Sequence, residues 1–352
     1  MSTAYELAAY EPAQRDDYLR LLHDAWGDAA LDGREFDWWF AKNPAGSLMS
    51  VARMDGRVVG VAAHSLFKMV LDGTQQLASF SVHATTTADA RGQGIFAALE
   101  EKHEREAQER GAAVVLAFAS KPTAPIFLGR LGWTEIGRLR IWARPFTRLV
   151  RRGPPVAPLE HFTHGRDSAA EWPNHVVRDP DHLNWRYVAA PRDYLALADG
   201  GDYAVLGHKE HRGVSIATVA DLVADDPKPL LRACLARVRP GARALFAVPP
   251  RTQRGEYVAL GFVPTTHSLH FMGKALAGSL NRDVRAWSFT LGDTDFFSPS
   301  PCVLSSSRSA STRSILRSPP RSRRSARSRS GSTSSSCSRR VATVTSCRGA
   351  SN

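Results

Sequence analysis

The chain has little cysteine and no long hydrophobic run. Three of its four cysteines lie after residue 297, so the first 297 residues contain only Cys234. A single cysteine provides neither a disulfide framework nor a cysteine-based zinc site, and it suits a reducing cytoplasm. No stretch approaches the roughly 18 uninterrupted apolar residues of a transmembrane helix. The first residues lack a basic region followed by an apolar one, so we expect no signal peptide and no membrane partner.

An excess of charge of one sign is also missing from most of the chain. The 352 residues carry a net charge of +12, but residues 298–352 hold 11 Arg and no Asp, Glu or Lys. The first 297 residues hold 35 Lys and Arg against 34 Asp and Glu. This near-neutral body has no electrostatic footprint of a polyanion-binding protein, and we expect that nucleic acid is not its partner.

The segment 298–352 differs from the rest of the chain. It contains 20 Ser beside its 11 Arg, and its apolar periodicity is lost. Such a segment buries too little apolar surface to offset its ordering entropy, so we expect disorder. It is either a basic arm that binds RNA or DNA, or the product of a frameshift in a GC-rich gene, since out-of-frame reading of such a gene yields Arg, Ser and Pro. Resequencing the gene distinguishes the two hypotheses.

A Pro-rich stretch divides the body into two parts. Residues 151–160 begin Arg-Arg-Gly-Pro-Pro-Val-Ala-Pro, which indicates an interdomain linker. We therefore expect one domain over residues 1–150 and another over residues 161–297.

The two parts resemble each other. Phe36-Asp-Trp-Trp-Phe40 and Pro44 align with Leu183-Asn-Trp-Arg-Tyr187 and Pro191 at a shift of 147 residues, which also sets Asp55 on Asp202. Further on, Leu131-Gly132-Trp133 aligns with Leu260-Gly261-Phe262 at a shift of 129. Aromatic clusters followed by proline at fixed spacing favour an internal duplication, although two α/β segments of similar composition could also share them by chance.

The pattern of the first part predicts a mixed α/β fold. Apolar residues at helical spacing predict a helix over 13–26, and Asp-Gly turns at 55–56 and 72–73 predict hairpins among strands 48–53, 58–66, 68–71 and 76–85. A charged helix over 95–110 follows, then a buried strand over 113–119, a short helix over 125–131 and a strand over 134–143. Hairpins pair antiparallel strands whereas a crossover helix joins parallel ones, so the sheet is expected to be mixed, with helices packed on it.

The loop before the charged helix carries the clearest chemistry. It reads Arg91-Gly92-Gln93-Gly94-Ile95-Phe96 and follows the strand that ends near residue 85. Glycine lets the backbone lie close to a ligand, and the first N–H groups of a helix have no partner within it. Such a helix start is an anion site that suits a pyrophosphate, and Arg91 adds a charge. The alternative is a tight strand-to-helix turn beside a solvated arginine.

This loop resembles motif A of the GCN5-related N-acetyltransferases (GNAT), whose pattern is Gln/Arg-x-x-Gly-x-Gly/Ala. The helix over 125–131 with Leu131-Gly132-Trp133 is similar to motif B of the family, so the resemblance covers about residues 5–143. It implies the acyl-CoA N-acyltransferase fold and acetyl-CoA as co-substrate. The amides of Gly92, Gln93, Gly94, Ile95 and Phe96, with Arg91, would hold the pyrophosphate, and Ala84, Thr85 and Thr86 would hydrogen-bond the pantetheine. Phe96 departs from the small residue that usually ends the motif.

The family's reaction is direct attack of an amine on the thioester, which requires a proton acceptor and a proton donor. Members often carry a tyrosine four residues before the Gly of motif B, but Leu128 stands there and cannot donate a proton. His83 at the strand end is the candidate base, although a packed or solvated histidine is the alternative interpretation. Glu35 and Asp37 are further candidates within a cluster that is more typical of packing aromatics.

The second part lacks the phosphate loop. Ala224-Asp-Asp-Pro-Lys-Pro229 precedes its charged helix, and two carboxylates there would repel a pyrophosphate. We therefore expect a degenerate GNAT-like copy. In the stretch 287–296, Asp293 and Asp295 either face a cationic amine or belong to a last strand and turn. Three His-x-x-His pairs occur, but no carboxylate or cysteine completes a set at metal spacing, so we expect no metal.

The sequence thus predicts an N-acetyltransferase that moves acetyl from acetyl-CoA to a primary amine of a small molecule or sugar. Because of Leu128 and Phe96, a non-catalytic acyl-CoA-binding protein stays open as an alternative. Nucleic-acid binding through the basic tail is a third interpretation. A monomer and a homodimer are both compatible with the sequence.

Overall fold

The computed structural model describes residues 5–119, 123–146, 154–166, 172–211 and 214–294. The tail over 298–352 and the start of the expected linker, residues 151–153, lie outside these ranges. We refer to residues 5–146 as the first half and to residues 154–294 as the second half.

The elements follow the order expected for the first half. The strands are β1 (Glu6–Ala9), β2 (Ser47–Met54), β3 (Arg57–Leu71), β4 (Thr74–Thr86), β5 (Ala112–Ala119), β6 (Thr134–Pro145), β7 (Ala157–Pro158), β8 (Asn174–Val176), β9 (Asp193–Asp199), β10 (Asp202–His211), β11 (Val214–Val223), β12 (Ala244–Ala247), β13 (Val263–Ala275) and β14 (Trp287–Ser288). The α-helices are α1 (Arg15–Trp26), α2 (Gly33–Phe36), α3 (Ile95–Glu109), α4 (Ala124–Gly129), α5 (Pro180–Leu183), α6 (Lys228–Arg237) and α7 (Arg254–Ala259). Short 3-10 or π turns are η1 (Pro12–Gln14), η2 (Gly27–Ala29), η3 (Asp37–Ala41), η4 (Ala88–Ala90), η5 (Asn184–Val188), η6 (Val284–Ala286) and η7 (Leu291–Asp293).

The hairpin turns of the first half are confirmed. Asp55 and Gly56 have φ values of 50° and 76°, and Asp72 and Gly73 have values of 48° and 82°, as two-residue hairpin loops require. One boundary was wrong: β3 runs unbroken from Arg57 to Leu71, where the sequence predicted two strands. Its partner β4 pairs with it over nearly the whole length, so the ladder carries the strand through Phe67 and Lys68.

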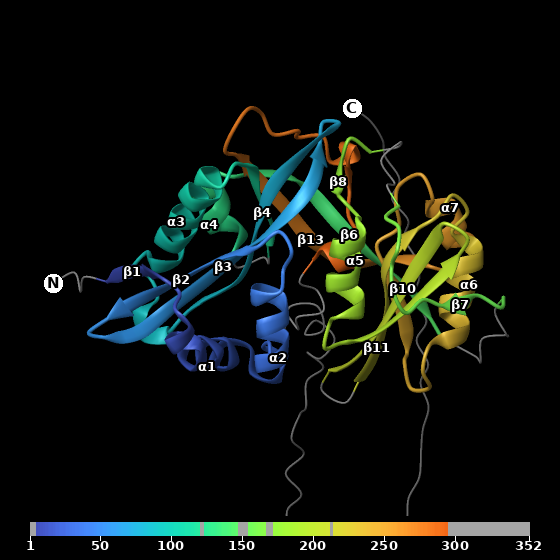
Figure 1. The fold of residues 1–352 in the computed structure, drawn as a ribbon, viewed down its shortest axis with the longest axis horizontal. Helices are drawn as coiled ribbons and strands as arrows, with labels where there is room; N and C mark the ends of the chain where they lie inside the picture. The colour runs from blue at the N-terminus through green and yellow to red at the C-terminus, as the bar shows by residue number, and fades with distance from the viewer. Residues whose placement is uncertain (1–4, 120–122, 147–153, 167–171, 212–213, 295–352) are drawn as a thin grey trace, which may run out of the picture. The chain divides into compact units, whose positions relative to one another are not determined.

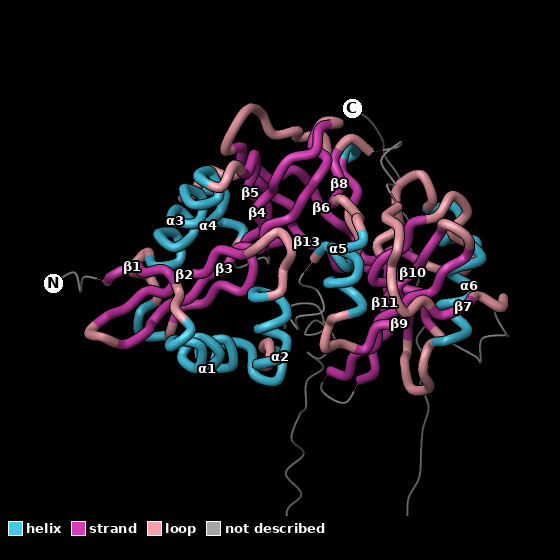
Figure 2. The backbone as a smooth tube through the Cα atoms, in the orientation of Figure 1, coloured by secondary structure: helices cyan, strands magenta, loops and turns pink. Residues whose placement is uncertain are grey.

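All described strands belong to one mixed sheet (Figures 1 and 2). Their order is β1-β2-β3-β4-β5-β13-β6-β12-β11-β10-β9-β7, and β8 pairs with β3 and β14. The pairs β4·β5, β11·β12 and β8·β14 are parallel, and the other pairs are antiparallel. Parallel pairs occur where α3 and α6 cross over, as the mixed-sheet prediction required.

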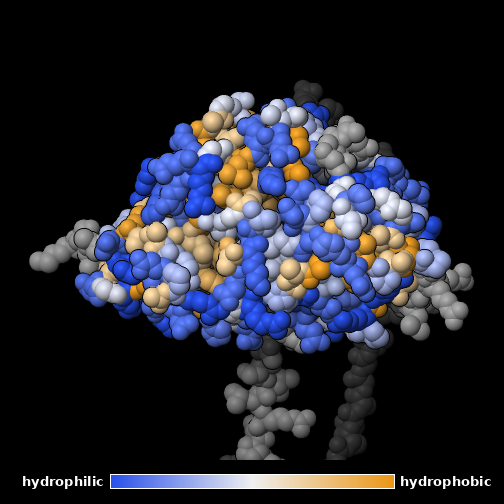
Figure 3. Space-filling model, in the orientation of Figure 1, coloured by the Kyte–Doolittle hydropathy of each residue, from blue (hydrophilic) through white to orange (hydrophobic). Residues whose placement is uncertain are grey.

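Helices cover both faces of the first half. Alternate residues of a strand point to opposite faces, and Val51 and Val61 pack in the core that contains α1, whereas Ala52 and Ala62 pack with α3. The surface in Figure 3 is mainly hydrophilic, with small hydrophobic groups between hydrophilic residues. Most large apolar side chains therefore pack against the faces of the sheet rather than lying on this surface.

One long strand of each half, β6 and β13, lies beside strands of the other half. β13 of the second half inserts between β5 and β6, and β6 of the first half pairs with β12. Phe271 of β13 pairs with Phe118, as Trp142 of β6 pairs with Ala247. A shift of 129 residues converts one pair into the other, and this is the shift at which the two Leu-Gly-aromatic motifs align.

Two tryptophans join the halves at the other sequence similarity. Trp38 Nε1 donates to the carbonyl of Trp185 at 2.6 Å, and Trp185 Nε1 donates to the carbonyl of Trp38 at 2.9 Å. These residues are 147 positions apart, so the equivalent residues face each other with reciprocal bonds. The hairpin tip at Asp55–Gly56 corresponds instead to Gly200–Gly201, so the sequence alignment of Asp55 with Asp202 is wrong by two residues.

Candidate functional site

Strand β4 carries a bulge at the place where the sequence predicted a ligand. Val61 pairs with Thr85 and Ala63 pairs with Val82, which leaves His83 and Ala84 opposite a single residue of β3. His83 has a φ of 49°, the left-handed conformation of a bulge residue. The bulge bends the strand and changes the direction of the residues that follow it.

Strands β4 and β5 separate just before this bulge. They pair from Leu77 to Phe80, and the rest of β5 pairs with β13 on its other edge. Within the described residues, no ladder to β5 covers the outer edge of β4 from residue 81 to residue 86. Backbone groups at such an edge are available to a ligand, and Ala84, Thr85 and Thr86 are half-buried. The expected pantetheine residues therefore lie at a divergence between two parallel strands.

The loop beyond β4 has the backbone that its glycines indicate. Gly92 and Gly94 have φ values of 81° and 85°, which L side chains rarely adopt. Gly94 is the N-cap of α3, where no side chain caps the helix and no acidic residue occupies the first turn. The first amides of α3 are thus left to a ligand, with the positive end of the helix dipole behind them. Ile95 is buried in the core and contributes its amide alone, while Gln93 is exposed.

A second arginine, which sequence reasoning missed, stands over this loop. A Cβ built on Gly94 would lie 2.6 Å from one terminal nitrogen of Arg130 and 2.8 Å from the other. Arg91 donates through Nε to the carbonyl of Thr86 at 3.3 Å, and both arginines are exposed. Its place in the sequence could have indicated it, because Arg130 directly precedes the Leu131-Gly132-Trp133 motif. Guanidinium groups and the first amides of a helix are groups that bind anions in proteins.

Phe96 does not occupy this site. Its ring packs edge-on against Phe127 of α4, with centroids 5.5 Å apart and planes at 88°. The side chain that departs from the family motif therefore serves the contact between α3 and α4.

His83, the candidate base, is buried among aromatic rings. Its ring lies 5.9 Å from Trp26, 5.8 Å from Trp39 and 5.9 Å from Phe40, and its side chain is almost fully enclosed. Burial, and after it the charges of Arg192 and Lys209, lower the pKa of His83 to about 3. The imidazole is therefore neutral at physiological pH, and it is a weak base.

The acidic candidates face other side chains. Glu35 accepts from Nε of Arg192 at 2.7 Å across the two halves, and Asp37 binds Arg15 at 2.9 Å. Lys209 lies near Arg192 and Glu35, and burial followed by the charge of Arg192 lowers its pKa to about 8. Residues from the second half thus set the electrostatics around His83, and no local motif could have indicated them.

Two further expectations are settled by burial and exposure. Leu128 is exposed on α4 and has no donor to offer. Asp293 is buried and accepts from Nη2 of Arg178 at 2.7 Å, so the interpretation in which it faces a cationic amine is wrong. Its proposed companion Asp295 lies outside the described residues. Among the residues described, no group of three or more His, Cys, Asp or Glu side chains could hold a metal ion.

The mixed sheet with its crossover helices is consistent with the acyl-CoA N-acyltransferase (GNAT) fold. Residues 6–136 match the family model described as an acetyltransferase (GNAT) domain. This match covers less than half of the chain and lies in the first half, where the loop motif resembles that family. No curated protein matches the sequence.

Solved structures share the fold at low identity. A GCN5-related N-acetyltransferase from Anabaena variabilis has a TM-score of 0.54 at 12% identity, covering 78% of this chain and 73% of the other. A putative acetyltransferase from Pyrococcus horikoshii has a TM-score of 0.54 at 13% identity, covering 80% and 93%. The N-myristoyltransferase of Saccharomyces cerevisiae with bound myristoyl-CoA has a TM-score of 0.59 at 10% identity, covering 78% and 83%. The shared fold extends over both halves.

None of the helices described here is long and apolar enough to cross a membrane.

Proposed function

We propose that the protein is an N-acetyltransferase that transfers acetyl from acetyl-CoA to a primary amine of a small molecule or sugar. The observation that carries the proposal is the uncapped N-terminus of α3 behind Gly92 and Gly94, beside two arginines. It lies next to the divergence of β4 from β5, so a phosphate site and an extended backbone edge are adjacent. A phosphorylated carrier with a long amide-containing arm fits this combination.

Each group of residues has a distinct role in the proposed site. The amides from Gly92 to Phe96, with Arg91 and Arg130, bind the pyrophosphate. The backbone of Ala84, Thr85 and Thr86 pairs with the pantetheine amides, as an added strand would. The β4 bulge then aims the thioester carbonyl at the side where the acceptor amine arrives. This arrangement accelerates transfer mainly by positioning the two reactants.

The proposed reaction also requires a proton acceptor and a proton donor. The ammonium of the acceptor must lose a proton before it attacks, and the CoA thiolate must gain one. His83 is the candidate acceptor of that proton by its position at the bulge, although its pKa of about 3 makes it a weak base. Lys209, with a pKa of about 8, is the second candidate, since a measurable fraction is unprotonated at neutral pH. Water takes the place of the missing acid at Leu128.

We also propose that the two halves are tandem GNAT-like domains, residues 1–150 and 161–297, of which the second is degenerate. The shared shifts of 147 and 129 residues and the reciprocal tryptophan bonds support a duplication. The cytoplasm, where acetyl-CoA is available, is the proposed location.

Acetyl-CoA binding to the full chain tests the carrier site. Calorimetric titration is expected to show saturable binding that Gly94→Asp reduces about a hundredfold or more, because a carboxylate would meet the pyrophosphate and a side chain would strain the left-handed loop. Arg130→Ala is expected to weaken binding about tenfold, since a charge-assisted hydrogen bond contributes about 1.5–3 kcal/mol.

Gly56→Asp is the matched control. Gly56 also has a positive φ, but it lies at the β2–β3 tip. Nothing lies within 4 Å of its Cβ, whereas a Cβ at Gly94 meets the flexible end of Arg130. Equal loss in Gly56→Asp and Gly94→Asp would mean that backbone strain, not the loop charge, causes the effect. Absence of binding by the unaltered chain would remove the enzyme proposal.

A non-catalytic acyl-CoA-binding protein is the second candidate, and Leu128 is the observation that favours it. The two differ in turnover. An enzyme releases free CoA thiol at a rate that rises with the concentration of a primary amine, whereas a binding protein shows saturable binding and no amine-dependent release.

A further inference from the structure

The second half contains the same strand divergence as the first. β11 pairs in parallel with β12 only at Ala217–Leu245 and Thr218–Phe246 within the described residues, although β11 continues to Val223. β11 also has a bulge, at Ala220, where its register with β10 shifts. The end of β11 is therefore the counterpart of the proposed pantetheine edge at the end of β4, and the two ends differ in burial. The end of β4 is half-buried, whereas β11 from residue 217 to residue 223 is entirely buried.

A segment from the end of the described chain lies in this second divergence. We call Thr290–Thr294, of sequence Thr-Leu-Gly-Asp-Thr, the plug segment. Its turn η7 packs on β11, and Leu291 is buried against Val248 and Ile141. The space that remains between β11, β12, α7 and Thr290 is a cavity of about 10 Å³, which is no larger than one water molecule.

Glycine at the centre of the plug segment fits the bulge closely. A Cβ on Gly292 would lie 2.9 Å from the carbonyl oxygen of Ala220 and would overlap the hydroxyl of Tyr187. No side chain fits there without displacing the backbone of β11. The contact places the plug backbone against the bulge, at the position that corresponds to His83 and Ala84 in the first half.

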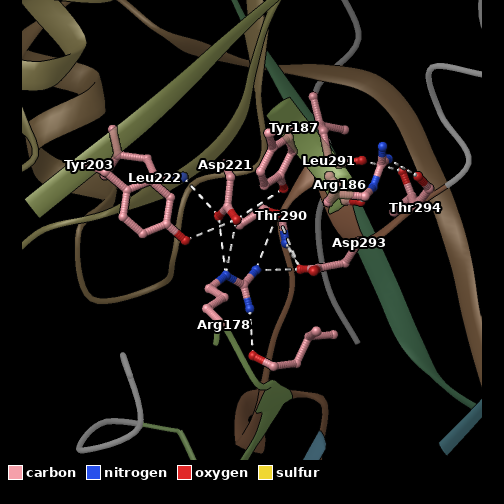
Figure 4. A network of polar contacts seen from close by, with 12 residues as sticks. Arg178, Arg186, Tyr187, Tyr203, Asp221, Leu222, Thr290, Leu291, Asp293 and Thr294 are labelled. Carbon is pink, nitrogen blue, oxygen red and sulfur yellow. Dashed lines mark hydrogen bonds and ion pairs between the residues drawn. The ribbon is translucent and has the colours of Figure 1, made fainter. Parts of the chain in front are cut away.

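Arg178 holds the side chain of the plug segment (Figure 4). Its guanidinium lies between two buried carboxylates, at 2.7 Å from Asp293 and 3.1 Å from Asp221 of β11. Asp221 also accepts from the hydroxyls of Tyr187 and Tyr203 at 3.0 and 3.1 Å. One guanidinium thus serves two buried carboxylates, which is the pairing that burial of a charge requires. Asp293 accepts through Oδ2 from Arg178 and from Thr290, while its Oδ1 is buried without a hydrogen-bond partner among the described residues.

Arg186 holds the backbone of the same segment. Its Nε donates to the carbonyl of Gly292 at 2.9 Å, and Nη2 donates to the carbonyl of Thr294 at 3.4 Å. The side chain is completely buried, and its guanidinium carbon lies 4.7 Å from the centre of the Trp39 ring. A fully buried arginine is rare. Here two of its N–H groups donate to the backbone of the plug segment.

The phosphate position of the second half is occupied as well. Asp226 accepts from the amide of Lys228 at the start of α6 at 3.1 Å. This carboxylate satisfies an amide of the kind that stays open at α3. A pyrophosphate would meet negative charge there.

We propose that the cleft of the second half is a peptide-binding site whose ligand is the chain's own plug segment, Thr290–Thr294. The segment binds through Arg178 and Arg186 where an acyl carrier would otherwise lie. It follows, resting on the proposed function, that each chain binds one acyl-CoA, in the first half. The second half thus anchors the end of the body and supports the wall formed by Trp39.

Hydrogen–deuterium exchange of the full chain, with and without acetyl-CoA, tests the proposal. Peptides that cover 290–294 are expected to exchange as slowly as those of β11, because three amides of the segment have acceptors within it. Acetyl-CoA is expected to slow exchange over 84–96 and to leave 244–260 and 290–294 unchanged. Rapid exchange at 290–294, or a response there to acetyl-CoA, would overturn the proposal.

Two variants locate the anchor. Asp293→Asn keeps the shape of the side chain but removes the charge that pairs with Arg178, and it should speed exchange of 290–294 at least tenfold. Asp283→Asn is the control, because Asp283 belongs to the same stretch and pairs with exposed Arg285. Unchanged exchange in Asp293→Asn would contradict the anchoring role.

Gly292→Ala gives an independent check that changes no charge. Because the added methyl group would overlap Tyr187, it should release the plug segment, with exchange in the first half unaffected. If acetyl-CoA changes the exchange rate of no peptide, the proposed function fails. The exchange rate of 290–294 still tests whether the plug segment is bound in the second half.

Discussion

At the scale of single residues, the proposed carrier site depends on conformation and the acceptor side depends on burial. Gly92 and Gly94 adopt backbone angles that other residues rarely reach, and this frees the amides of α3. His83 sits in a left-handed bulge and is enclosed by three aromatic rings, so its environment and not its intrinsic chemistry sets its charge. The same holds for His182, whose pKa burial also lowers to about 3.

These two histidines predict a pH dependence of stability. Their folded pKa values lie below the ordinary value near 6.5, so between about pH 6.5 and 3 the unfolded chain binds more protons. The free energy of unfolding should therefore fall as the pH drops through this window, by up to about 1.4 kcal/mol per pH unit for each histidine. His83→Asn, which tolerates the left-handed backbone, should reduce the slope. Urea unfolding at pH 7 and pH 5 measures it, and an unchanged slope would contradict the burial of a neutral imidazole.

At the scale of elements, the two crossover helices differ in what faces their first amides. α3 begins at Gly94 with no side-chain cap, whereas the amide of Lys228 at the start of α6 donates to the carboxylate of Asp226. The exchanged strands are the second feature of this scale, because β13 is bonded to a strand of the first half on both edges. A change in β13 should thus be felt in the first half.

Gly273→Val tests that coupling. A Cβ there would lie 2.6 Å from Leu116 Cδ2 and 2.8 Å from the carbonyl of Val115, both on β5. Overpacking of this kind costs about 1–3 kcal/mol, and we expect a lower urea midpoint in a single transition seen by probes in both halves. Gly255→Ala is the matched control, since nothing lies within 4 Å of its Cβ and its φ is ordinary, so stability should stay within about 1 kcal/mol. Two separate transitions would mean that the halves unfold independently.

At the scale of the whole molecule, the two halves share one sheet and one aromatic core. The core that contains Trp38 also contains Trp185 and Phe271, and the central ladder alternates strands of the two halves. Neither half completes its own sheet, because β5 and β6 are separated by β13. The two halves therefore depend on each other for their strand pairing.

Fragments test this mutual dependence. Residues 1–150 expressed alone should be poorly folded or aggregate, because the edge of β5 and both edges of β6 lose their partners. Co-expression with residues 151–297 should give a soluble complex of the two fragments. Circular dichroism and size-exclusion chromatography measure both outcomes, and a stable monomer of residues 1–150 would show that β13 is dispensable.

The local sequence predicted what depends on short-range spacing. The hairpin turns at residues 55–56 and 72–73, helix α3 with its glycine boundaries and the mixed sheet all follow from patterns a few residues long. The aromatic and Leu-Gly motifs also indicated which residues are equivalent. Arg130, Arg192 and Lys209 were not predicted, because their roles depend on partners that are distant in sequence.

The sequence by itself determined the glycine loop between a strand and a helix, whose backbone leaves the first amides of α3 without a side-chain cap. The tertiary structure decided what surrounds that loop. In the folded protein His83 is buried and Glu35 pairs with Arg192. Strands β6 and β13 pair with strands of the other half, and Thr290–Thr294 lies where β11 and β12 diverge. These outcomes depend on the pairing of charges and strand edges over more than a hundred residues. Such pairing is fixed by burial, where a charge or a backbone group must find its partner, and no local pattern records it.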